Sequence, residues 1–231
     1  MSIGDLNNDK LNDLVIIDAT GTQATVYYFD DSLGTYAHSA IINLNLPTNY
    51  TCDGVISTAI PTELQDLIFV CSLVDGTSGD VTETKLFYYQ QSVSQTSSSS
   101  STNKYSWAKL DSTFSDVSLY PGSHPLALDV NGDQAMDLLY QSADKGLQVA
   151  LGSRTATETY TPKDFFSNFV LTNTDNTDCK SPNTEDIISL PNSNAFVDLN
   201  GDCVPDLLLT RQTAGSLTDT SSTVSTYYEI Y

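Results

Sequence analysis

Short apolar runs separated by polar turns recur along the chain. Residues 14–17, 67–70, 138–140 and 207–209 consist of Leu, Val, Ile and aromatic residues, and runs of this length are typical of buried strands. Further strands are expected at 25–29, 86–89, 147–151 and 227–231, and fourth strands at 36–42, 105–110 and 165–171. No segment has a helical period. The pattern predicts an all-β fold built from four-stranded antiparallel units.

Three of the four apolar runs follow directly on the same nine-residue acidic pattern. It has oxygen-bearing side chains at its positions 1, 3, 5 and 9, namely Asp5, Asn7, Asp9 and Asp13; Asp129, Asn131, Asp133 and Asp137; and Asp198, Asn200, Asp202 and Asp206. A fourth copy at residues 58–66 keeps only its last residue, Asp66, and has Thr58, Ile60 and Thr62 at the other positions. Repeats that start at 5, 58, 129 and 198 have the period of a propeller or a solenoid.

Oxygen ligands at alternate positions of a tight loop suit Ca²⁺, which takes about six to eight of them. The backbone carbonyl of position 7 is a further candidate ligand in each loop (Leu11, Ala135 and Val204), and the carboxylate of position 9 completes the set. We therefore predict up to three structural Ca²⁺ ions. Asp-rich and Asn-rich turns also occur without metal, but three matching copies favour the metal.

The EF-hand is excluded as the type of loop. An EF-hand loop needs Gly at position 6 and a bidentate Glu at position 12. Position 6 is Lys10, Gln134 or Cys203, and position 12 is Ile16, Tyr140 or Leu209.

Composition excludes several functions. The formal charge is −20 with only nine Lys and Arg residues, so binding to nucleic acid or to an anionic membrane surface is not expected. The two histidines, His38 and His124, lie in no recognisable nucleophile motif, and we expect no enzyme. Trp107 and the 13 tyrosines leave a carbohydrate-binding protein as an alternative.

Four cysteines, Cys52, Cys71, Cys179 and Cys203, allow three disulfide pairings. A hairpin that turns near residue 62 would place Cys52 opposite Cys71, which leaves Cys179 for Cys203; four free thiols are the alternative. Asn49 begins the only glycosylation sequon. Disulfides, a glycan and weak Ca²⁺ sites together favour an extracellular or luminal location. Neither a signal peptide nor a membrane-spanning stretch is visible.

The acidic loops also carry a resemblance. The segments GDLNNDKLNDLVI, HPLALDVNGDQAMDLLY and SNAFVDLNGDCVPDLLLT resemble the FG-GAP/VCBS repeats of integrin α-subunit propellers. They are most similar to those of the T-cell immunomodulatory protein family, also called Linkin. The resemblance implies Ca²⁺-ligand roles for the Asp and Asn residues of the three loops. It further implies a large ectodomain with one membrane span and roles in cell adhesion and immune modulation.

The expected architecture is a β-propeller segment of about 3.5 to 4 blades. The blades are expected at about 1–50, 51–120, 121–190 and, incomplete, 191–231, with a Ser-rich hairpin insert at 91–103. Because so few blades do not close a ring, the rest of a longer chain or another chain is expected to complete it. The expected function is non-enzymatic binding of a protein partner in adhesion, with an assembly subunit or a glycan-binding lectin as alternatives.

Overall fold

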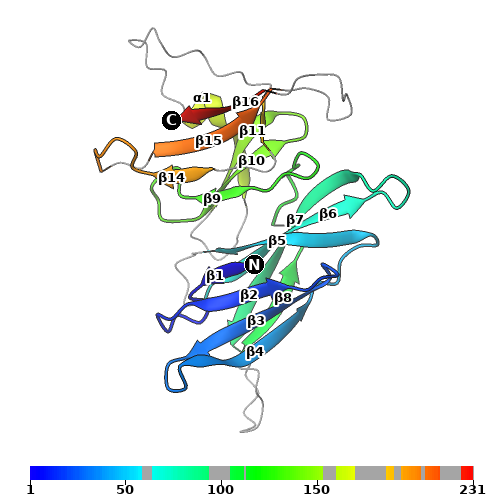
Figure 1. Cartoon of the computed structure of the whole chain (residues 1–231), viewed down its shortest axis with the longest axis vertical. Helices are drawn as coiled ribbons and strands as arrows, with labels where there is room; N and C mark the ends of the chain where they lie inside the picture. The colour runs from blue at the N-terminus through cyan, green and yellow to red at the C-terminus, as the bar shows by residue number, and fades with distance from the viewer. Residues whose placement is uncertain are drawn as a thin grey trace.

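The computed structural model describes residues 1–58, 64–93, 105–111, 113–152, 160–169, 186–189, 194–203, 206–213 and 225–230. These residues form four antiparallel sheets of four strands each, together with one short helix (Figure 1). The prediction of an all-β fold with four-stranded antiparallel units is confirmed. No helix in the described part of the chain is long and apolar enough to cross a membrane.

The first three sheets are meanders in which spatial order follows chain order. Sheet 1 contains β1 (Ser2–Gly4), β2 (Asp13–Ile17), β3 (Gln23–Asp30) and β4 (Thr35–Asn43). Sheet 2 contains β5 (Tyr50–Thr58), β6 (Asp66–Val74), β7 (Val81–Val93) and β8 (Tyr105–Leu110). Sheet 3 contains β9 (Leu126–Leu128), β10 (Asp137–Ser142), β11 (Gly146–Leu151) and β12 (Thr161–Asp164).

The prediction that residues 165–171 form the fourth strand of sheet 3 is wrong. The strand of that place, β12, ends at Asp164, and the chain continues as the helix α1 (Phe165–Phe169). The Ser167 backbone N–H donates to the Asp164 carboxylate at 2.7 Å, which is the contact of a helix N-cap. A local cap therefore overrides the β-favouring composition of this segment.

Sheet 4 has an interrupted first strand. It contains β13 (Ile187–Ile188), β14 (Ala195–Val197), β15 (Asp206–Gln212) and β16 (Thr226–Ile230). Both β13 and β14 pair with the edge of β15 that β16 leaves open, since Ile188 lies opposite Arg211 and Ala195 opposite Leu208. At the interruption the Thr210 N–H donates to the Asn194 side chain at 2.8 Å, so the backbone of β15 keeps its partner there.

Each sheet has two faces, and the side chains of its second strand define them. In β6, Leu67 and Phe69 share a core with sheet 1, whereas Ile68 and Val70 share a core with sheet 3. We call the face toward the preceding sheet the rear face and the face toward the following sheet the forward face. Alternate residues of a strand point to opposite faces, so one run serves both cores.

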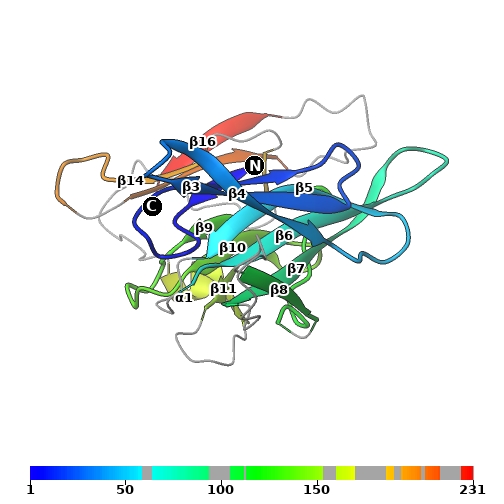
Figure 2. The same ribbon diagram turned by 90° about the horizontal axis from the view of Figure 1, so that it is seen from below.

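The four sheets stack in chain order through three such cores. In sheet 3, Leu138 and Tyr140 pack on the forward face of sheet 2, and Leu139 packs on sheet 4, where it meets Leu207 and Leu209. The stack runs from sheet 1 at the bottom of Figure 1 to sheet 4 at the top, and Figure 2 shows it from below. At each contact the forward face of one sheet meets the rear face of the next.

A buried arginine lies on the rear face of sheet 4. The Arg211 side chain is fully buried, and its guanidinium lies 3.3 Å from the Glu229 carboxylate and donates to the Asp186 carbonyl. The Tyr227 hydroxyl donates to the Asp186 side chain. A buried charge needs such partners, so this cluster fixes how β13, β15 and β16 meet.

The hairpin of β5 and β6 is covalently closed. Cys52 and Cys71 are directly opposite each other and form a disulfide, as the sequence predicted. Cys203 is exposed and is not disulfide-bonded, contrary to the predicted Cys179–Cys203 pairing; Cys179 itself lies outside the described residues.

Removing the disulfide is expected to lower the free energy of unfolding by about 3 kcal/mol, because a cross-link restricts the unfolded chain. The two cysteines are 19 residues apart, which sets this size in the chain-entropy relation. Urea denaturation of Cys52→Ala/Cys71→Ala against the oxidised protein measures the change. Dithiothreitol should destabilise the original protein by a similar amount and leave the double variant unaffected; equal stability with and without the bond would contradict the prediction.

Candidate metal loops

The three acidic patterns each form the turn between the first and second strands of a sheet. Residues 5–12 connect β1 to β2, residues 129–136 connect β9 to β10, and residues 198–203 lead from β14 toward β15. All three turns lie on the same side of the stack, the left in Figure 1. The prediction that these loops join two strands is confirmed.

The hydrogen bonds of the three loops repeat position by position. In the first loop the Asp5 carboxylate accepts the backbone N–H groups of Asp9 and Lys10 at 3.0 and 2.8 Å. The Asn7 amide oxygen accepts the Asp9 N–H at 3.0 Å. Asp129 with Asn131, and Asp198 with Asn200, make the equivalent bonds in the other two loops. The loops therefore share one conformation.

The backbone of the loops explains which residues recur between the oxygen donors. Positions 4 and 6 have positive φ in every copy, at Asn8 (60°) and Lys10 (70°), Gly132 (75°) and Gln134 (67°), and Gly201 (82°) and Cys203 (68°). Glycine and asparagine tolerate this left-handed region best, which accounts for position 4. Position 6 carries other residues, so the hydrogen bonds of its N–H group to the position 1 carboxylate hold it there.

The aspartate at position 9 supports the fold as well as the loop. Asp13 is buried, and its carboxylate accepts the N–H groups of Leu6 at 2.9 Å and Phe29 at 3.0 Å. Asp137 is buried in the same way, with Val130 and Gly152 as donors at 2.9 and 2.8 Å. Each carboxylate thus ties its loop to the end of the third strand.

Sheet 2 shows that this role does not depend on the rest of the pattern. Asp66 is 3% exposed and accepts the Gln91 N–H at 2.6 Å and the Tyr88 hydroxyl, although its loop lacks the other acidic positions. The fold role of position 9 was not recognised from the sequence. The signal was present, because the degenerate copy keeps this aspartate alone.

The carboxylates of a loop lie close enough to repel one another. Burial is the main cause that raises the pKa of Asp13 to about 6, and the charges of Asp9 and Asp5 add to it against the hydrogen bonds from Phe29 and Leu6. Burial likewise raises the pKa of Asp137, with a contribution from Asp133 and Asp129. A cation at the loop would reverse this repulsion.

The donors of the loops have the chemistry of a Ca²⁺ site. They are carboxylate, amide and backbone carbonyl oxygens, which hard cations prefer. The side-chain donor at position 3 of each loop is an asparagine. No group of three or more His, Cys, Asp or Glu side chains is arranged to hold a metal within the described ranges. Leu11 and Ala135 occupy position 7 of their loops, whereas Val204 lies outside the described residues.

Other residues singled out in the sequence lie away from these loops. Asn49 and Thr51 of the sequon are exposed, at the turn before β5 and on β5 itself. His124 Nε2 lies 3.2 Å from Asp53 Oδ1, and this contact is the first cause of a lowered pKa of Asp53. Trp107 on β8 packs against the core between sheets 1 and 2, so it is not an open platform for a sugar. In the Ser-rich insert, residues 94–103 lie outside the described part.

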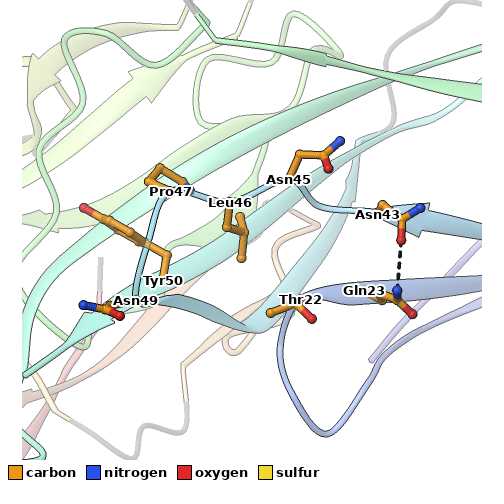
Figure 3. Close-up of a pocket in the computed structure, with 8 residues that line it drawn as sticks. All are labelled: Thr22, Gln23, Asn43, Asn45, Leu46, Pro47, Asn49 and Tyr50. Carbon is orange, nitrogen blue, oxygen red and sulfur yellow. Dashed lines mark hydrogen bonds between the residues drawn. The ribbon is translucent and has the colours of Figure 1, made fainter. Parts of the chain in front are cut away.

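A polar hollow of about 370 Å³ beside the ends of β3 and β4 was not foreseen (Figure 3). Its side chains are all uncharged, and Gln23 donates to Asn43 at 2.9 Å. The Asn45 and Asn49 amides and the Tyr50 hydroxyl point in different directions in Figure 3. Because these groups do not converge, the hollow offers no focused set of contacts to one ligand. Its lining residues are Thr22, Gln23, Asn43, Asn45, Leu46, Pro47, Asn49 and Tyr50.

Comparison of the chain with protein-family models, with curated proteins and with solved structures gave no match.

Proposed function

We propose that this chain is a non-enzymatic β-propeller segment whose blades are stabilised by structural Ca²⁺ and whose surfaces bind a protein partner. One observation carries the proposal: three loops at equivalent places in stacked four-stranded sheets repeat the same hydrogen bonds around the same oxygen donors. Each loop keeps carboxylates at positions 1, 5 and 9 beside the amide oxygen of position 3, and this set of oxygen donors suits a hard cation.

In the proposed sites the side chains of positions 1, 3, 5 and 9 and the carbonyl of position 7 hold the ion. Bound Ca²⁺ supplies positive charge that offsets the repulsion and fixes the turn. The loop N–H groups orient the position 1 carboxylate, as the Lys10 N–H does for Asp5 at 2.8 Å. Asp13 and Asp137 connect the loop to the end of the third strand of their sheets, because their carboxylates accept the N–H groups of Phe29 and Gly152.

The setting that fits these sites is extracellular or luminal, where Ca²⁺ is near millimolar. The Cys52–Cys71 disulfide and the exposed Asn49 sequon support it. Adhesion through a protein partner is the function that the resemblance to integrin-type repeats favours, with the chain as the ectodomain of a membrane protein. An assembly subunit is the second candidate, which the uncovered apolar sheet faces described below favour.

Equilibrium dialysis against radioactive Ca²⁺ tests the proposal. After chelation and removal of the chelator, the protein is expected to take up about three ions with dissociation constants of roughly 10⁻⁴ M. Excess Mg²⁺ should compete poorly, because Mg²⁺ demands a smaller octahedral shell. No uptake by the folded protein at millimolar Ca²⁺ would refute the calcium sites.

A further inference from the structure

The two ends of the stack each present an apolar sheet face that no other described sheet covers. The rear face of sheet 1 carries Leu14 and Ile16 of β2, flanked by Ile3, Tyr27 and Ile41 on the neighbouring strands. Ile3 is 57% exposed and Ile41 is 65% exposed. In sheets 2, 3 and 4 the positions that match Leu14 and Ile16 are buried or packed in a core between sheets.

The forward face of sheet 4 is the counterpart at the other end. Leu208 lies in register with Ala195 and Ile230, and Thr210 lies in register with Tyr228. Tyr228 is 66% exposed and Ile230 is 63% exposed. In sheets 1, 2 and 3 the residues that match Leu208 are Val15, Ile68 and Leu139, and all three are buried in a core between sheets.

Both faces carry almost no charge, in a chain with 29 acidic residues. The only charged position on either is Asp206, at the loop end of β15, where it accepts the Leu199 N–H at 2.8 Å. The other positions of the rear face of sheet 1 are Ile3, Leu14, Ile16, Gln23, Thr25, Tyr27, Phe29, Tyr36, Ser39, Ile41 and Asn43. Those of the forward face of sheet 4 are Ala195, Val197, Leu208, Thr226, Tyr228 and Ile230, together with Ile187, Thr210 and Gln212, which are buried.

The two open faces are of opposite kinds, one rear and one forward, and this indicates what covers them. All three contacts between the described sheets join a forward face to a rear face. The stack leaves open the rear face of sheet 1 and most of the forward face of sheet 4, where Tyr228 and Ile230 are exposed. We propose that a second copy of this chain supplies the missing partner, with sheet 4 of one copy packed on sheet 1 of the other. The proposal rests on the propeller stacking proposed above. Two copies joined twice in this head-to-tail manner form a closed two-fold dimer without an uncovered sheet face.

Light scattering coupled to size-exclusion chromatography tests the contact. The 231-residue protein is expected at twice its chain mass of 25.1 kDa. Ile41→Asp on sheet 1 and Tyr228→Asp on sheet 4 each place an unpaired charge in both contacts of the dimer. Each variant is therefore expected to raise the dimer dissociation constant by roughly 100-fold or more and to run as a monomer.

Mixing the two variants separates head-to-tail pairing from other arrangements. The Ile41→Asp copy keeps an unaltered sheet 4, and the Tyr228→Asp copy keeps an unaltered sheet 1, so an equimolar mixture should recover dimers through one intact contact. Leu33→Asp is the matched control: Leu33 is as exposed as Ile41, at 65%, but lies in the β3–β4 turn, and this variant should stay dimeric.

Three results would overturn the proposal. These are a monomer at all concentrations, a dimer that only one of the two face variants disrupts, and a mixture of variants that stays monomeric. Calcium uptake is measured on the same samples by equilibrium dialysis. A monomer that still takes up three ions would reject the second copy and leave the calcium sites standing, whereas a dimer without uptake would do the reverse.

Discussion

Phe69→Ala is expected to lower the free energy of unfolding by about 3 to 5 kcal/mol, as large core truncations do. Phe69 is fully buried on the rear face of sheet 2 and lies in the core shared with sheet 1. Its ring meets Tyr89 edge to face, with 5.2 Å between the centroids. Truncation therefore removes an aromatic pair and opens a cavity between two sheets that hold each other in place.

Urea denaturation followed by circular dichroism, in millimolar Ca²⁺ throughout, measures this loss. Phe69→Leu keeps most of the volume and should cost less than about 1.5 kcal/mol, as volume-conserving core changes usually do. Leu33→Ala, at a residue that is 65% exposed in the β3–β4 turn, is the control for an apolar truncation outside this core. A cost under about 1 kcal/mol for Phe69→Ala would be far below that of a core truncation. It would mean that sheets 1 and 2 do not stack as described.

The strands could be predicted because their apolar runs are short and bounded by turns, but the partners of their faces could not. All of β6 from Asp66 to Ser72 is buried, which fits a strand covered on both sides. In β2 the equally apolar Ile16 is 39% exposed. Both segments have the same apolar pattern, and only the stack decides which faces meet a neighbour.

The departures from the expected strands have local causes. The segment from Phe165 has aromatic and β-branched residues and was expected to be a strand, but the Asp164 side chain caps a helix there. The break between β13 and β14 depends on Asn194, whose side chain replaces a backbone acceptor for Thr210. Single side-chain to backbone bonds of this kind are not visible in hydrophobic periodicity.

The oxygen donors of the candidate site could be predicted from the sequence, but the hydrogen bonds that hold the loops to the third strands could not. The spacing of Asp and Asn identified the loop oxygens, since alternate residues of a tight turn face one centre. The buried bonds of Asp13 to Leu6 and Phe29 depend on a strand 16 residues away from the carboxylate. Such a contact follows from tertiary structure, and only the retention of Asp66 in the degenerate copy pointed to it.

Removal of calcium is expected to lower the free energy of unfolding by about 4 to 5 kcal/mol. With dissociation constants near 10⁻⁴ M, millimolar Ca²⁺ stabilises the fold by roughly 1.5 kcal/mol per site. Three sites together are comparable to the net stability of a domain, about 5 to 15 kcal/mol. Differential scanning calorimetry in Ca²⁺ and in chelator should therefore show a large fall in melting temperature when the metal is removed.

The Asp133→Ala variant tests whether the stabilisation by calcium comes from the acidic loops. Asp133 is exposed at position 5 of the second loop, and its carboxylate accepts the N–H of the buried Ala135 at 2.7 Å, a bond that the variant loses whether or not Ca²⁺ is present. The variant is therefore expected to lose about 1.5 kcal/mol more in Ca²⁺ than in chelator, because the wild-type loop holds no ion in chelator. Asp116→Ala, at an exposed aspartate outside the loops, should behave as wild type in both. Equal losses for Asp133→Ala with and without Ca²⁺ would mean that the carboxylate acts through the turn alone, and the calcium role would be rejected.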